Sequence, residues 1–116
     1  MSNDNIQVHI GTAEDMGKRF VNAWKRAEQG ESVSETNITF PDLEALLTAL
    51  TPKRLQLLRY VRHHHVRNIK SLADDLHRDY KNVHNDVEAL ARLGLLSRTS
   101  ESVVAPYAEV DARFVL

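Results

Sequence analysis

The sequence has no cysteine, and its 116 residues include only four glycines and three prolines. Without cysteine the chain can form no disulfide, no thiolate zinc site and no cysteine nucleophile. The four glycines are scattered, which excludes a glycine-rich phosphate-binding loop. No apolar run approaches the ~20 residues that cross a bilayer, and the polar N-terminus does not resemble a secretory signal. These absences predict a cytoplasmic protein that does not contact the membrane.

The residue pattern does not predict an enzyme or a metal site either. Ser71, His77 and Asp79 lie close together in the sequence, but each has a capping or turn role. Consecutive histidines at 63–65 would point about 100° apart on a helix, so at most two of them could bind one metal ion. A basic helix end that complements the helix dipole explains them better. We expect no catalytic residue, no cofactor and no metal.

The charged residues are distributed unevenly, although the net charge is only −1. The segment 1–50 has a net charge of −4, the segment 51–98 has +5, and the segment 99–116 has −2. Five of the six histidines also lie in the basic segment. A basic middle indicates contact with an anion, although a solvated basic face would have the same composition.

Local patterns in the acidic segment predict a strand and one or two helices. Residues 5–10 alternate apolar and polar side chains, which is typical of a short strand. Apolar residues at helical spacing predict a helix over 12–30. A β-prone run at 38–40 precedes Pro41, which suits the first turn of a short helix.

The basic segment has the pattern of three helices followed by a hairpin. Helices are expected at 52–65, 71–76 and 80–93, and a hairpin at 95–105 with the loop 99–102. The expected capping residues are Thr51, Ser71 and Asp79. The expected buried stripe of the first helix comprises Leu55, Leu58 and Val61.

This order is that of a winged helix-turn-helix, in which a short turn joins the second and third helices. The predicted fold is therefore α+β and mostly α, with a winged helix-turn-helix DNA-binding domain at 51–106. Residues 1–50 form an N-terminal strand-helix extension for dimerisation or partner binding. Residues 107–116 form a C-terminal tail, in which a strand is expected at 112–115.

The third helix of this motif lies in the DNA major groove, with its N-terminal residues nearest the bases. Its buried face is expected to comprise Val83, Val87 and Leu90. Asparagine can pair with adenine, and lysine can donate to guanine or to a phosphate. The predicted DNA-binding residues are Ser71, Arg78, Tyr80, Lys81, Asn82, His84, Asn85 and Arg98.

Several of these side chains have alternative explanations. Tyr80 could stack on the sugar-phosphate backbone or close the core at the start of the helix. His84 could contact DNA, or it could be exposed or packed on a partner. Asp86 and Glu88 would repel phosphate, so we expect them to face away from DNA or to pair with residues such as Arg92.

The segment 71–96 resembles the DNA-binding region of MarR-like winged-helix regulators. More narrowly, residues 18–107 resemble a family of small DNA-binding transcriptional regulators from archaea and bacteria. The matching motifs are Phe20 with Trp24, Thr51 to Leu58, Arg78 to Val87, and Ala105 to Tyr107. The resemblance implies DNA binding, and it suggests a role beside toxin-like partner genes.

The sequence therefore predicts a regulator of transcription that binds duplex DNA sequence-specifically. The helix 80–93 would lie in the major groove, with a wing at 97–104, and the chain would form a homodimer. An alternative is a DNA-binding antitoxin that neutralises a toxin, through residues 1–50, and regulates its own operon. A winged-helix domain that serves only protein contact is a further alternative. RNA binding is less favoured, because the third helix lacks an exposed aromatic platform.

Overall fold

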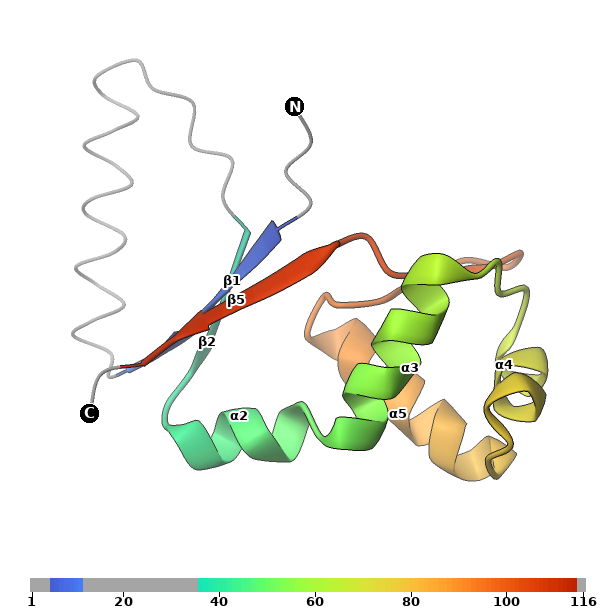
Figure 1. The fold of residues 1–116 in the computed structure, drawn as a ribbon, viewed down its shortest axis with the longest axis horizontal. Coiled ribbons are helices and arrows are strands. Elements are labelled where there is room, and N and C mark those ends of the chain that lie inside the picture. The colour runs from blue at the N-terminus through green and yellow to red at the C-terminus, as the bar shows by residue number, and fades with distance from the viewer. Residues whose placement is uncertain (1–4, 12–35, 115–116) are drawn as a thin grey trace, which may run out of the picture. The chain divides into compact units, whose positions relative to one another are not determined.

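The computed structural model describes residues 5–11 and 36–114 (Figure 1). These residues form four helices and two small sheets, which confirms the α+β class. The chain divides into two compact units. The sheet unit contains the first and last strands, and the helical unit is Ala49–Ala108. The helix predicted at 12–30, with Phe20 and Trp24, lies outside the described residues.

The sheet unit has three parallel strands in the order β2-β1-β5. They are β1 (Asn5–Ile10), β2 (Thr36–Phe40) and β5 (Glu109–Arg113). The alternation in β1 has the predicted effect, because Ile6 and Val8 are buried. The strand expected at 112–115 begins at Glu109 instead, since its position is set by pairing with the distant β1.

Helix α2 (Leu43–Ala49) follows β2 and begins after an aspartate cap. The carboxylate of Asp42 accepts a hydrogen bond from the backbone N–H of Ala45 at 2.8 Å. Pro41 therefore precedes the cap, and the helix does not begin there as the sequence suggested. Asp42 satisfies a free N–H of the first turn, which proline at that position could not do.

Helix α3 (Pro52–His63) begins at the predicted residue and ends two residues before the predicted end at 65. The Thr51 hydroxyl accepts a hydrogen bond from the N–H of Arg54, and Pro52 occupies the first turn. The buried residues are Leu57 and Val61, whereas Leu55 and Leu58 are half-buried. The expected stripe was therefore centred wrongly. Because α3 has apolar residues on several sides, its sequence alone does not show which side is buried, and the tertiary contacts decide this.

Helix α4 (Ile69–Leu76) begins two residues before the predicted start at Ser71. Asn68 is the cap, and its side-chain oxygen accepts from the N–H of Ser71 at 2.8 Å. The capping prediction for Ser71 is therefore wrong. The earlier start brings Ile69 into the helix, where it is buried with Leu72.

Helix α5 (Tyr80–Arg92) has Asp79 as its cap, as predicted. Its buried residues are Val83, Val87 and Leu90, which confirms the face expected from the sequence. The helix packs against α4. Gly94 follows at a φ of 81°, a left-handed conformation that suits glycine after a helix.

A short hairpin completes the helical unit. Strands β3 (Ser97–Arg98) and β4 (Val103–Val104) are antiparallel and are joined by the predicted four-residue loop 99–102. A pairing that the sequence did not predict adds Val66, from the link between α3 and α4. The N–H of Val103 donates to the carbonyl of Val66 at 2.9 Å. The hairpin is thereby tied to the helices by backbone pairing.

In the described residues, none of the helices has the length and apolar character needed to cross a membrane.

Candidate nucleic-acid interface

A three-residue turn joins α4 to α5 and sets the start of the candidate helix. His77 adopts a left-handed conformation with φ 55° and ψ 47°. Its N–H donates to the carbonyl of Asp74, and the next N–H, from Arg78, donates to that of Ala73. Asp79 then caps α5 by accepting from the N–H of Lys81 at 3.1 Å. The turn therefore satisfies the backbone at the ends of both helices.

The first two turns of α5 expose a continuous polar surface opposite the buried valines. Lys81, Asn82 and Asn85 are exposed, Tyr80 is 51% exposed, and His84 is half-exposed. These five predicted residues therefore lie together on one element. We call them the α5 surface.

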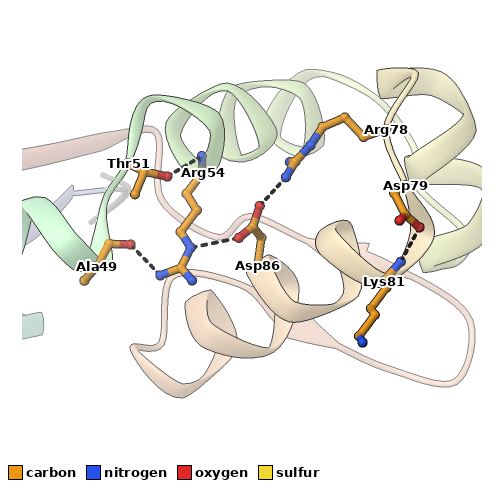
Figure 2. A network of polar contacts seen from close by, with 7 residues as sticks. All are labelled: Ala49, Thr51, Arg54, Arg78, Asp79, Lys81 and Asp86. Atoms are coloured by element: carbon orange, nitrogen blue, oxygen red, sulfur yellow. Dashed lines mark hydrogen bonds and ion pairs between the residues drawn. The ribbon is translucent and has the colours of Figure 1, made fainter.

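Three side chains of the α5 surface have no polar partner among the described residues. Within residues 5–11 and 36–114, the ammonium of Lys81 and the amides of Asn82 and Asn85 form no hydrogen bond or ion pair. Figure 2 shows the Lys81 side chain extending away from the neighbouring polar network. Asparagine has a low helix propensity, so its presence inside a helix usually reflects a contact that its amide makes. The exposed amides of Asn82 and Asn85 make no such contact with the described residues, which favours a role in contact with a ligand.

The remaining two residues of the α5 surface, Tyr80 and His84, contact each other, and His84 lies near Glu88, which pairs with the hairpin. The rings of Tyr80 and His84 lie 5.9 Å apart, and the Nε2 of His84 is 3.9 Å from the Oε1 of Glu88. Glu88 in turn forms an ion pair with Arg98 of β3. Arg98 is 42% exposed, so it remains accessible beside α5. Pairing of Glu88 with an arginine was one of the expected alternatives, but the partner is Arg98 and not Arg92, and the pair links the hairpin to the helix.

Arg78 belongs to a different network, which fixes α5 against α3 (Figure 2). Its Nη2 donates to the Oδ2 of Asp86 at 2.7 Å, and the Nε of Arg54 donates to the Oδ1 of Asp86 at 2.9 Å. A second nitrogen of Arg54 donates to the carbonyl of Ala49. Asp86 is 14% exposed and Arg78 is 16% exposed. One carboxylate therefore holds two guanidinium groups in a largely buried position.

This network changes the role of two residues. Asp86 pairs with arginine, which was one of the two alternatives expected, but its partners are Arg54 and Arg78 and not Arg92. The guanidinium of Arg78 is paired within the protein, so we leave Arg78 out of the α5 surface.

Ser71 also lies outside the α5 surface, since it is half-buried and its hydroxyl donates to the carbonyl of Asn68. No role in the site was predicted for Arg54, because no local pattern in the sequence links it to Asp86.

Of the three histidines at 63–65, His64 has structural contacts. The ring of His64 stacks on Tyr60 with a centroid separation of 4.0 Å. The hydroxyl of Tyr60 donates to Asp75 of α4 at 2.8 Å, and this hydrogen bond raises the pKa of Tyr60. In the described ranges no three histidine or acidic side chains come together as metal ligands.

Comparison with known proteins gives one result. The HVO_A0114 family model matches residues 49–112, which is more than half of the chain. The chain belongs to the HVO_A0114 family. This family is uncharacterised, and its match covers the helical unit and most of β5. No curated protein and no solved structure matches the chain.

Proposed function

We propose that the helical unit is a winged helix-turn-helix that binds duplex DNA and regulates transcription. Helix α5 would enter the major groove, and the 97–104 hairpin would be the wing. The α5 surface carries this proposal, because its lysine and asparagine side chains are exposed and form no hydrogen bond or ion pair with the residues that the structure describes. These are groups that hydrogen-bond to base edges and phosphates.

The topology of the unit supports the same conclusion. The order is helix, short pairing segment at Val66, helix, turn, helix and hairpin, which is the order of a winged helix. The turn between α4 and α5 comprises only residues 77–79, as a helix-turn-helix requires. The proposal also agrees with the resemblance to MarR-like regulators.

The ion pairs of Asp86 also support the proposal, because they keep an unpaired negative charge away from the α5 surface. Asp86 lies in the middle of α5, where an exposed carboxylate would repel phosphate. Its two arginine partners hold it against α3 and neutralise it. Glu88 is likewise paired with Arg98. Within the described structure, the exposed charges of α5 that lack a partner are therefore the cations of Lys81, in the first turn, and Arg92, at the end of the helix.

The test compares three exposed substitutions by fluorescence anisotropy on the duplex upstream of the gene. Lys81→Ala should reduce the slope of log affinity against log salt by about one, because one phosphate contact is lost. Asn85→Ala should lower the preference over a scrambled duplex by about 1–3 kcal/mol, while changing the salt slope little. Lys53→Ala removes the same charge from α3 and should leave both values unchanged.

The proposal would be wrong if all three variants bound both duplexes as the wild type does. Equal losses for Lys81→Ala and Lys53→Ala would also contradict it, because binding would then depend on net charge and not on the α5 surface.

A further inference from the structure

The outer edge of β5 is open in the part of the chain that the structure describes. β5 pairs with β1 along one edge, and none of the described strands pairs with the other edge. All five of its residues are exposed. Edge strands are usually protected from further pairing by charged side chains, lysine above all, by proline or by a bulge. β5 and the following Phe114 contain no proline, glycine or lysine, but β5 has three charged residues, Glu109, Asp111 and Arg113, so any partner strand must match these charges.

The side chains of β5 divide by face. Val110 and Ala112 pair in register with the buried Ile6 and Val8 of β1, so they share the apolar face of the sheet. Phe114 continues this alternation. Val110 is 39% exposed and Phe114 is 46% exposed. The apolar face therefore extends to the free edge, where it is incompletely covered.

The opposite face of β5 carries charges of both signs. Asp111 and Arg113 lie two residues apart on this face, and both are exposed. This arrangement makes the strand complementary to itself. When two copies run antiparallel about a two-fold axis at Ala112, Asp111 of each copy lies opposite Arg113 of the other. In the same register Val110 lies opposite Phe114, and the small Ala112 meets its own copy at the axis.

We propose that the chain forms a homodimer by antiparallel pairing of β5 with β5 of a second copy. The two sheets would then join in the order β2-β1-β5-β5-β1-β2. A two-fold axis places each complementary pair twice in the interface, which is why a second copy fits this edge better than an unrelated strand. Backbone pairing supplies affinity in such edge-to-edge contacts, and the side chains fix the register. The inference does not rest on DNA binding.

Two charge substitutions test both the dimer and its register, with sedimentation equilibrium of the full chain at micromolar concentrations and low salt. Asp111→Arg places arginine opposite arginine, and Arg113→Asp places aspartate opposite aspartate. Each change turns two attractive cross-strand pairs into two repulsive ones, so each variant should raise the dimer dissociation constant about tenfold or more. Both substitutions are on exposed positions, and circular dichroism should confirm that the fold is intact.

Mixing the two variants gives the decisive result. A heterodimer of the Asp111→Arg and Arg113→Asp chains restores two attractive pairs, so the equimolar mixture should dimerise about as tightly as the wild type, whereas each variant alone should dimerise about tenfold or more weakly. The control is Glu101→Arg in the hairpin loop, which makes the same charge change as Asp111→Arg and should leave the dimer intact. A monomeric wild type would overturn the proposal. So would variants that dimerise normally, or a mixture that stays monomeric.

Discussion

At the scale of single residues, the pairing of Asp86 explains how α5 contains acidic side chains and yet has no unpaired carboxylate in its described structure. Its carboxylate is 14% exposed and accepts from Arg54 and Arg78. The two arginines come from α3 and from the turn before α5, so the carboxylate connects three parts of the unit. Removing it would leave two poorly solvated cations without their shared partner, which is costly.

We expect Asp86→Asn to lower the free energy of unfolding by about 2 kcal/mol, because a charge is lost between two largely buried guanidinium groups. Urea denaturation monitored by circular dichroism measures this. Glu88→Gln is the matched control, since its pair with Arg98 is more exposed and should contribute less than about 1 kcal/mol. Equal effects of the two substitutions would contradict the role assigned to Asp86.

Tyr60 provides a second prediction at this scale. Its pKa is raised above the usual value of 10.0 by the hydrogen bond to Asp75. The neutral phenol is therefore favoured in the folded state. This contribution to stability is present below about pH 10 and is lost as the pH rises through the raised pKa.

An ultraviolet titration of the tyrosines should thus show that Asp75→Asn lowers the pKa of Tyr60 toward its usual value. Tyr60→Phe identifies the signal by its disappearance. An unchanged titration in Asp75→Asn would show that the hydrogen bond is absent in solution.

At the scale of the elements, the turn between α4 and α5 depends on one left-handed residue. His77 has a φ of 55°, where a side chain with a Cβ atom is strained. Glycine adopts this conformation freely and is the usual residue at the end of a helix. The side chain of His77 is also exposed.

His77→Gly should therefore raise the free energy of unfolding by about 0.5–1 kcal/mol, because the relief of strain exceeds the added entropy of the unfolded chain. The reciprocal control is Gly94→Ala, at φ 81°. A Cβ there meets nothing within 4 Å, so the expected loss of about 1 kcal/mol comes from the backbone alone. Thermal unfolding of both variants tests this, and a destabilised His77→Gly would contradict it.

The elements also show what the sequence could predict. Helices α3 and α5 were predicted with their caps Thr51 and Asp79, because capping and apolar spacing are local signals. The start of α4 was missed, since Ser71 and Asn68 are both good caps and only packing of Ile69 decides between them. The pairing of Val66 with Val103 joins residues far apart in sequence, and no local pattern indicates it.

In the candidate site, too, local patterns predicted some positions, whereas others depend on tertiary contacts. The exposed position of Lys81, Asn82 and Asn85 follows from the period of α5 once its buried face is known. The inward position of Arg78 could not be predicted, because it depends on how Asp86 and Arg54 meet across two helices.

At the scale of the whole molecule, the helical unit is inserted into the chain of the sheet unit. The chain leaves the sheet after β2 and α2, forms Ala49–Ala108, and returns as β5. The parallel pairing of β1 with β5 joins segments near the two ends of the sequence. The acidic segment and the basic segment therefore correspond closely to different units. This separation agrees with the two proposals, which place dimerisation at the β5 edge and DNA contact at the α5 surface.

The most direct test of the proposed function is the affinity of the wild-type protein for its own upstream duplex and for a scrambled duplex, measured over a series of salt concentrations. We predict that the upstream duplex binds more tightly by ~10³ or more, and that the affinity for both falls steeply with salt. Equal, weak binding to both duplexes at every salt concentration would contradict the account.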